Sequence, residues 1–398
     1  MSDTTTFVHA HAAHGDWHAA LAECRQQFDA QVAARQAEPG GAAPLTLGWC
    51  YLSDYYAPAA EAILAALQET WPGVAWVGAA GVGVCASGVE YFDEPAMVLM
   101  AAALPPSTFR LFSGQQPLPS ASTPSTSHFA PHTALVHAEG STPDVQDLLH
   151  ELSTRTATGY LFGGLSSARN RTLHMADGVF SGGLSGVLFG PEIGLISRVT
   201  QGCKPIGPAR TVTRAAHNLL FELDGEPALD CVLQDLGLGR DVPEETLASV
   251  LSATLVGLSK GDDDALSVPG RFGTDTLVRH VLGVDAQHGV LALADVVEDG
   301  MRLAFCTRNP AAARADLMRV ATEIRSELES GHSGRALGAL YISCSGRGGP
   351  HFGAPHAELQ MVRNALGDLP LAGFFAGGEI ARDRLYGYTG VLTVFTGH

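Results

Sequence analysis

The stretch LAGFFAGGE, from Leu371 to Glu379, is an apolar run with a glycine-rich end, and two earlier stretches end in the same way. They are GAAG, Gly78–Gly81, and GGLSS, Gly163–Ser167. Glycine tolerates positive φ and lets a backbone come close to another strand or to a ligand. A tight turn between strands explains each end alone, but three at corresponding places indicate a repeated module and favour a lined cleft.

The residues around the three glycine ends repeat one order of elements. In each copy an apolar run predicts a strand, a proline-started segment predicts a helix, the glycine-ended stretch predicts a second strand and another apolar run predicts a third. We therefore predict an α/β fold of mixed sheets flanked by helices, built from repeated strand-helix-strand-strand modules in two domains. The sequence does not determine the strand order, because the three copies could form one continuous sheet or two packed layers. The predicted elements are Leu45–Leu52, Pro58–Thr70, Val74–Ala79 and Ala96–Ala103; Thr133–Ala138, Pro143–Thr156, Gly159–Gly163 and Leu184–Phe189; and Gly338–Cys344, Pro355–Leu366, Leu371–Phe375 and Val391–Phe395.

Composition limits the class of protein. With 398 residues, 46% of them hydrophobic and 16% charged, the chain can bury a large core and is expected to be globular. The formal net charge of −17 argues against nucleic acid, and against an anionic membrane surface, as a partner. No apolar run is long enough to cross a bilayer, so we expect no membrane insertion.

Cysteine usage and the start of the chain predict a cytoplasmic protein. The seven cysteines are odd in number and contain no C-x-x-C, which fits reduced thiols better than a disulfide framework or structural zinc. Residues Met1–Thr4 have neither the basic nor the apolar region of a secretory signal.

A turn signal at Asp224-Gly225 predicts the domain boundary, which gives residues 1–223 and 224–398 as the two domains. Residues 105–131 are rich in Ser, Thr and Pro and predict a loose linker between the first two copies. Beyond the boundary, the sequence predicts strands at Thr276–Leu282, Val290–Val297 and Met301–Thr307, then a helix capped by Asn309 that leads into the third copy.

The main candidate site is the segment after the first strand of the third copy. Cys344 is followed by Arg347, Gly348 and Gly349, which together offer a thiol, a fixed cation and bare backbone amides. Glycine-rich amides can cradle an anion, arginine can grip a carboxylate through two hydrogen bonds, and a nearby cation can lower a thiol pKa. We predict these four residues to bind a ligand; the alternative for Cys344 is a small buried hydrophobe.

Glu379 is predicted to complete this site, because it follows Gly377-Gly378 at the end of a strand of the same copy. It could receive an ammonium group while Arg347 takes a carboxylate, a pairing suited to an amino acid. The alternative is an internal salt bridge between Glu379 and Arg347. Phe375 and Ser166, at the glycine ends, are expected to line the same pocket.

Lys204 is a further candidate ligand-binding residue, because it is one of only two lysines and lies in the glycine- and proline-rich stretch GCKPIGP. The alternative is a solvated lysine in a connection. Four histidines near the start form a surface tract in our interpretation, so no metal site is predicted. They are His9, His11, His14 and His18.

An enzyme stays open as an alternative. Cys344 would be its nucleophile, and His351 or His356 its base. The sequence has no P-loop, no complete dinucleotide fingerprint and no G-x-S-x-G elbow. We therefore predict no other catalytic residue.

Four longer stretches together resemble the FIST family, and the resemblance covers nearly the whole chain. It implies an N-terminal FIST domain to about residue 223, a C-terminal one beyond it, and a sensory module that binds small ligands such as amino acids. The stretches are Gly202–Pro208 with Thr211–Arg214, Phe221–Leu229, Ile342–Gly348 and Leu371–Ala381.

The resemblance also implies partners. Bacterial members of the family often stand beside, or are fused to, histidine kinases, chemoreceptors or cyclic-dinucleotide enzymes. Some resemble haem-binding nitric oxide sensors, so haem held by a histidine is an alternative to a protein without a cofactor. The prediction is a cytoplasmic sensor for intracellular signal transduction, with an amino acid or another small carboxylate as ligand.

Overall fold

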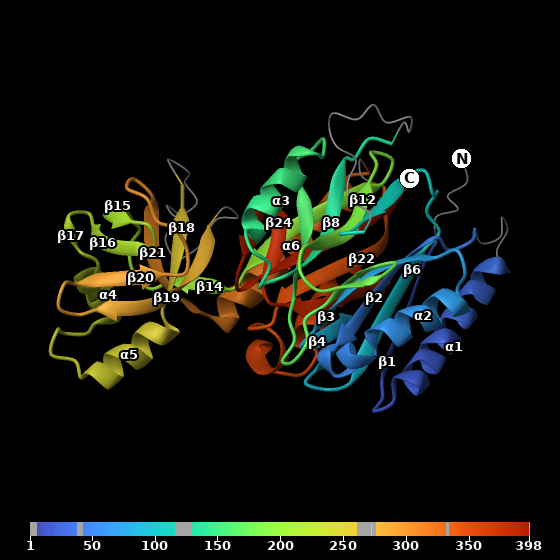
Figure 1. Cartoon of the computed structure of the whole chain (residues 1–398), viewed down its shortest axis with the longest axis horizontal. Helices are drawn as coiled ribbons and strands as arrows, with labels where there is room; N and C mark the ends of the chain where they lie inside the picture. Colours follow the sequence, from blue (N-terminus) through green and yellow to red (C-terminus); the bar gives the residue numbers. More distant parts are fainter. Residues whose placement is uncertain are drawn as a thin grey trace. The chain divides into compact units, whose positions relative to one another are not determined.

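A computed structural model describes residues 6–37, 43–115, 129–260, 272, 276–331 and 334–397. The chain forms two compact units, a larger one of Met1–Thr200 with Leu317–His398 and a smaller one of Gln201–Asp316 (Figure 1). Helices pack on mixed sheets in the larger unit and on an antiparallel sheet in the smaller one, which confirms the predicted mixed α/β fold class. Residues 1–5 and the Ser/Thr/Pro-rich centre of the expected linker, 116–128, lie outside the described residues. Among the described helices, none is long and apolar enough to cross a membrane.

The compact units differ from the expected division at residues 223 and 224. The chain leaves the larger unit at the end of β13 (Gly194–Gln201) and returns within α6 (Pro310–Glu329). It must return because the sheet neighbour of β13 is β26 (Thr389–Gly397), at the far end of the chain. The smaller unit is therefore an insertion within the third copy.

The described residues of the larger unit form three six-stranded sheets, and their strand orders correspond. They are β1-β6-β2-β3-β10-β11, β7-β12-β8-β9-β24-β25 and β13-β26-β22-β23-β4-β5. In each sheet the third and fourth strands are parallel, as β2 and β3 are in the first. The bounds not yet given are β1 Phe7–Ala13, β2 Leu47–Ser53, β3 Ala75–Gly81, β4 Gly83–Ala86, β5 Val89–Phe92, β6 Ala96–Ala102, β7 Phe109–Phe112, β8 Thr133–Glu139, β9 Leu161–Ser166, β10 His174–Ala176, β11 Val179–Phe180, β12 Leu184–Phe189, β22 Arg335–Cys344, β23 Leu371–Ala376, β24 Glu379–Arg382 and β25 Arg384–Tyr386.

Two long helices of the chain begin at a side-chain N-cap. The Asp16 side chain accepts the His18 N–H at 3.0 Å, and the Asn309 side chain accepts the Ala312 N–H at 2.8 Å. In each copy one helix joins the two parallel strands: α2, α3 or α7. Their bounds, with those of the short helices, are α1 Trp17–Gln36, η1 Asp54–Ala59, α2 Ala60–Thr70, α3 Val145–Thr154, η3 Gly349–Phe352 and α7 Ala357–Leu366.

Each copy places a hairpin in the sheet of another copy. After β3 the chain forms the hairpin β4–β5, which pairs with β23 of the third sheet. After β9 it forms β10–β11, which pairs with β3 of the first sheet, and after β23 it forms β24–β25, which pairs with β9 of the second. The exchange is cyclic, so every sheet is completed by a hairpin from a different copy.

One glycine in each copy lies where the two parallel strands come closest. A Cβ at any of the three would lie 1.7 or 1.8 Å from the carbonyl oxygen of its register partner, so only glycine fits. This close approach of two strands accounts for a glycine at the same place in every copy. The pairs are Gly78 with Cys50, Gly163 with Val136 and Gly373 with Tyr341.

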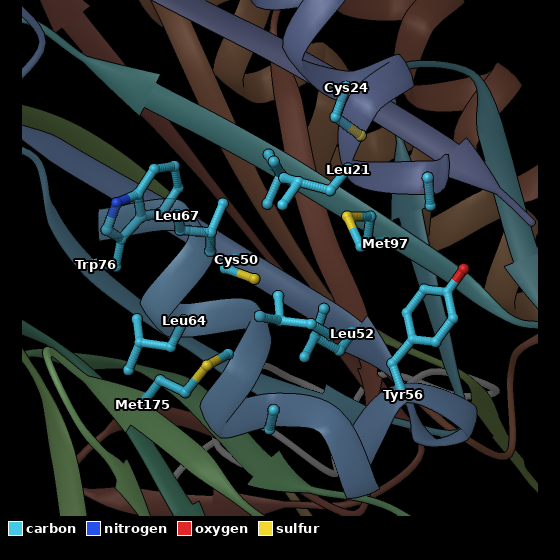
Figure 2. Packing of buried hydrophobic residues seen from close by; sticks show 14 of the residues in the cluster. Leu21, Cys24, Cys50, Leu52, Tyr56, Leu64, Leu67, Trp76, Met97 and Met175 are labelled. Atoms are coloured by element: carbon cyan, nitrogen blue, oxygen red, sulfur yellow. The ribbon is translucent and has the colours of Figure 1, made fainter. Parts of the chain in front are cut away.

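The first sheet is covered on one face by an apolar core. Leu21 and Cys24 of α1 and Leu64 and Leu67 of α2 pack with buried side chains of the sheet (Figure 2). The second sheet has a similar, smaller apolar core beneath α3. The sheet residues that Figure 2 labels are Cys50, Leu52, Trp76, Met97 and Met175.

In the described part of the smaller unit, six antiparallel strands pair in a closed ring, β21-β15-β16-β20-β19-β18, because β18 also pairs with β21. Helices α4 and α5 pack on it through a core that includes Val232, Leu251 and Leu291. Asp224, the expected boundary, lies between two of its strands, β16 and β17. The bounds are β14 Cys203–Pro205, β15 Arg210–Ala216, β16 Leu219–Leu223, β17 Glu226–Pro227, α4 Ala228–Leu236, α5 Glu244–Ala253, β18 Leu255–Ser259, β19 Leu277–Asp285, β20 Val290–Leu293 and β21 Arg302–Arg308.

Candidate functional site

The glycine ends of the three copies come together and bond to one another. Ser166 Oγ donates to the Ala80 carbonyl at 2.8 Å. Ser167 Oγ accepts the Val82 N–H at 3.1 Å and donates to the Phe375 carbonyl, so one residue of the second copy joins the other two. Ser166 and Phe375 are buried. The residues predicted to line a cleft therefore form a packed junction between the copies.

Gly377 and Gly378 belong to the same junction. The Gly377 N–H donates to the Leu165 carbonyl at 3.0 Å, and the Leu165 N–H donates to the Gly378 carbonyl at 2.8 Å. These bonds continue the pairing between β24 and β9. The backbone groups expected to face a ligand are engaged in joining the third copy to the second.

Arg347 lies in a fully buried ion pair with Glu358 of α7. Their side chains are 1% and 0% exposed. Arg347 Nε and Nη2 donate to Glu358 Oε1 at 3.1 and 2.9 Å, and Nη1 donates to the Thr200 carbonyl at 3.4 Å. The guanidinium also lies over the Phe352 ring, 5.2 Å from its centroid. Glu358 thus occupies the place that the sequence analysis gave to a ligand carboxylate or to Glu379.

Two strand residues share this carboxylate. Tyr341 Oη and Ser343 Oγ, both on β22, donate to Glu358 Oε1 at 2.7 and 3.0 Å. The register with β23 shows that these positions correspond to Cys50 and Leu52 in the first copy and to Val136 and Ala138 in the second, which belong to the apolar cores. The third sheet therefore has buried polar side chains where the other two are apolar.

Glu90 joins the group from the exchanged hairpin. Its Oε1 accepts the backbone N–H groups of Glu358 and Leu359 at 3.0 and 3.2 Å, at the N-terminus of α7. Burial, followed by the charge on Glu358, raises the pKa of the Glu90 carboxyl to about 7. We call Glu90, Tyr341, Ser343, Arg347 and Glu358 the α7 cluster.

Glu379 lies within electrostatic range of the cluster and is fully buried. Its Oε2 accepts the Thr389 N–H at 3.0 Å and the Thr389 Oγ–H at 2.7 Å. Burial raises the pKa of the Glu379 carboxyl to about 8, against the lowering effects of Thr389, Arg347 and the Cys344 thiol. No N–H or O–H donor of the described residues reaches Glu379 Oε1 or Glu358 Oε2. When the Glu379 carboxyl is ionised, the region thus has more buried acceptor atoms than donors.

Cys344 is buried, with 7% of its surface exposed. Burial, with a further contribution from the charge on Glu379, raises the pKa of its thiol. A thiol in such a place is protonated at neutral pH and is a weak nucleophile. His356, one of the two bases considered for it, accepts the Glu90 N–H at Nδ1 at 3.0 Å. The geometry gives no support to the alternative of a cysteine enzyme.

The glycines after Arg347 serve packing as well. A Cβ on Gly348 would lie 2.2 Å from the Phe92 ring and 3.0 Å from the Phe375 ring, and Gly349 has a positive φ of 67°. Phe92 belongs to the exchanged hairpin β4–β5. The loop of residues 345–349 is half-buried apart from Arg347, which is buried. Its glycines therefore allow it to pack closely against the hairpin of the first copy.

Lys204 and the histidines near the start of the chain do not belong to the α7 cluster. Lys204 is exposed on β14 of the smaller unit, and His217 is exposed in the β15–β16 turn with a positive φ of 51°. His9 and His11 are on β1, where His11 Nδ1 lies 2.5 Å from Tyr91 Oη. No group of three or more potential metal ligands gathers among the residues that the structure describes.

Sequence reasoning missed Glu358, Tyr341, Ser343 and Glu90. Each looked ordinary alone, as a helix residue, two residues of an apolar strand and a residue beside a turn. Aligning the three copies would have shown Tyr341 and Ser343 at positions that are apolar in the others.

The sequence also contains no sign of a pocket of about 400 Å³ in the larger unit, because segments far apart in the sequence line it. Its lining residues are His132, Thr133, Thr158, Tyr160, Phe162, Pro191, Ile193, Gly194, Leu195, Ser197, Arg198 and Thr393.

Two family models match the chain. The FIST N domain matches residues 46–226, and the FIST C domain matches residues 228–382. An uncharacterised protein of Mycobacterium tuberculosis is 31% identical over 383 residues, which cover 93% of this chain and 96% of that protein. An uncharacterised protein of Mycobacterium bovis is 31% identical over 353 residues, which cover 85% and 86% of the two chains. The junction of the two models lies close to Asp224, inside the smaller compact unit.

Proposed function

Because this chain belongs to the FIST family, we propose that it is a sensory protein that binds a small molecule beside the α7 cluster. The family is consistent with a sensory role in signal transduction. In this proposal the protein works in the cytoplasm and passes its signal to a separate partner, such as a histidine kinase, a chemoreceptor or a cyclic-dinucleotide enzyme.

The contrast between corresponding sheet faces carries the proposal. The first two copies pack their helices through apolar side chains, so this architecture does not need a buried ion pair for stability. Replacing such a pair by apolar residues is often neutral or stabilising. Places where a fold departs from its own packing rule are expected to be functional or strained. The α7 cluster is such a place.

The ligand group that suits this region is an ammonium. Arg347 is already neutralised by Glu358, so a ligand carboxylate would have to compete with a bound one. Glu379 Oε1, in contrast, lacks an N–H or O–H donor among the described residues. An amino acid or an amine would supply one. Entry requires movement of the half-buried loop that carries Arg347, residues 345–349.

Isothermal titration calorimetry with a matched series tests the ligand group. L-Alanine, ethylamine and propanoate share a small apolar part and differ in the charged groups that they carry. We expect ethylamine and L-alanine to bind and propanoate not to bind. Binding of propanoate alone would place the ligand on Arg347, and binding of none of the three would make the cluster purely structural for ligands of this size.

Proton release separates the two sites in the same experiment. The pKa of Glu379 is raised to about 8, so its carboxyl is protonated at pH 7 and must ionise to receive an ammonium. Titrations in buffers of different ionisation enthalpy should then show a proton released on binding, and the affinity should rise up to about pH 8. Glu379→Gln should weaken ethylamine binding by about 1.5–3 kcal/mol. Glu61→Gln, which changes an exposed acid of α2, is the matched control.

The haem alternative has no observation in its favour in the described residues. No particular histidine of this sequence was predicted to hold the iron, and among the described residues His217 is exposed in a turn of the smaller unit. Native mass spectrometry of the freshly purified protein, compared with its denatured mass, detects a retained ligand of any class. A mass excess near that of haem would overturn the proposal, whereas a small non-covalent excess would identify the occupant.

A further inference from the structure

The pocket of about 400 Å³ is lined by residues that are separate from the α7 cluster. We infer that it is a second binding site, for a small neutral molecule that carries a hydroxyl or carbonyl group on a mainly apolar body. Its walls come from the second and third sheets, through the ends of β8 and β9 on one side and β13 and β26 on the other. Both sheets belong to the larger unit.

A row of hydroxyls forms the polar part of the pocket. Tyr160 Oη donates to Ser197 Oγ at 2.9 Å, and Ser197 Oγ lies 2.7 Å from Thr393 Oγ1. Thr393 is 1% exposed, so the inner end of this row of hydroxyls is buried beneath the pocket surface. A hydroxyl has one proton to donate and two lone pairs, so the Tyr160 oxygen keeps the capacity to accept a bond from a ligand.

The charges at the pocket are balanced without a ligand. Arg198 Nη2 donates to Glu327 Oε2 at 2.7 Å, and its Nε lies 3.7 Å from Glu323 Oε2. Arg198 Nη1 also donates to the Ser197 carbonyl at 3.0 Å. Among the described residues no aspartate or glutamate lines the pocket, and His132 is the other basic side chain of its lining. A charged ligand would therefore lose its hydration without gaining an unpaired partner, which favours a neutral one.

The size and the remaining lining set the shape of the ligand. A volume of about 400 Å³ falls in the range of small-molecule sites. Phe162, Pro191, Ile193 and Leu195 supply apolar surface next to the hydroxyl row. A single ring with a short polar substituent matches both features.

Three probes of one shape and different charge test the inference. Benzyl alcohol, benzoate and benzylammonium are titrated separately and followed by saturation-transfer NMR on the full chain. We expect saturable binding of benzyl alcohol to this pocket. Leu195→Trp, which fills the pocket, should abolish that binding, and Tyr160→Phe, which removes only the hydroxyl, should weaken it by about five- to tenfold.

Controls keep this result apart from the proposed sensory site. Glu379→Gln, at the other site, should leave benzyl alcohol binding unchanged, and Leu195→Trp should leave ethylamine binding unchanged. Benzoate that binds as tightly as the alcohol would overturn the neutral class. Benzyl alcohol binding that persists in Leu195→Trp, or the absence of saturable binding by all three probes, would overturn the site. Failure of ethylamine alone would count against the proposed function and not against this pocket.

Discussion

The first and third sheets have the same strand order but cover their parallel strands differently. In the first, Cys50 and Leu52 face the apolar side chains of α1 and α2 (Figure 2). In the third, the corresponding Tyr341 and Ser343 donate to a buried carboxylate of α7. One scaffold thus carries an apolar interface and an ionic one at equivalent places. The ionic one is a specialisation of the third copy and not a requirement of the fold.

Breaking the ion pair should give the largest effect. Arg347→Met leaves Glu358 buried without its cation, and we expect the free energy of unfolding to fall by about 3–5 kcal/mol. All four tryptophans, Trp17, Trp49, Trp71 and Trp76, lie in the larger unit, so urea unfolding followed by tryptophan fluorescence reports on that unit. The double variant Arg347→Met with Glu358→Leu should recover most of the loss. A loss below about 1 kcal/mol in the single variant would mean that Glu358 finds water or a proton instead.

The apolar interface should be the next most sensitive. Leu52→Ala, at the position that corresponds to Ser343, removes a fully buried side chain, and we expect a loss of about 3 kcal/mol in the same urea experiment. The matched control is Leu282→Ala on an exposed site of the smaller unit, which should leave the fluorescence transition unchanged. A loss at Leu52 as small as that of the control would contradict the contrast between the two faces.

The polar face should lose stability as the pH rises towards neutrality. The pKa of Glu90 is raised to about 7 and that of Glu379 to about 8, from an ordinary value of 4.5. At these two carboxyls the folded chain binds more protons than the unfolded chain, and their contribution to stability falls as the pH rises through this window. From pH 6 to pH 7 this contribution should decrease by about 1–2 kcal/mol, while His9 and His137, whose pKa values are lowered by burial to about 4 and about 3, add stability over the same range. Urea titrations at both values therefore compare Glu379→Gln with the parent chain, and we expect the variant to retain about 1 kcal/mol more stability on going to pH 7; an equal pH dependence would assign the effect to other groups.

The smallest effect is expected at a single hydroxyl. Ser343→Ala removes one of the donors to Glu358 Oε1 and leaves Tyr341 and Arg347 in place. We expect a loss of about 1 kcal/mol, measured as a shift of the urea midpoint with an unchanged slope. A stabilised variant would show that the serine is kept for a reason other than stability.

The sequence predicted the elements of the three copies well, because local patterns determine them. The apolar runs of β2, β8 and β22 and the helix α6 capped by Asn309 lie where these patterns place them. One exception is β7, Phe109–Phe112, which pairs with β12 although it falls in the stretch expected to be a loose linker. Its partner strand, and not its own composition, orders it.

The candidate site was predicted only in part. Burial of Arg347, Cys344 and Glu379 near one another follows from their strands, but the partner of Arg347 does not. Glu358 is a single acid within a helix, and only the fold shows that it faces β22 instead of solvent. The glycines were noticed for the right reason, close backbone approach, but the approach is to a neighbouring strand. A sequence pattern indicates which backbone conformations and contacts a residue allows, but it does not identify the tertiary partner of that residue.

The cyclic exchange of hairpins also governs the order in which the chain can fold during synthesis. The hairpin β4–β5, Gly83–Phe92, is made early, but its partner β23, Leu371–Ala376, is made only after the whole smaller unit. Until then the third sheet and its α7 cluster cannot be assembled, and the early hairpin must stay unpaired while the whole smaller unit is made. Contacts between segments so distant along the chain form slowly, because a long loop must close first. The larger unit should therefore complete its fold only after β23 has been made, in one late and cooperative step.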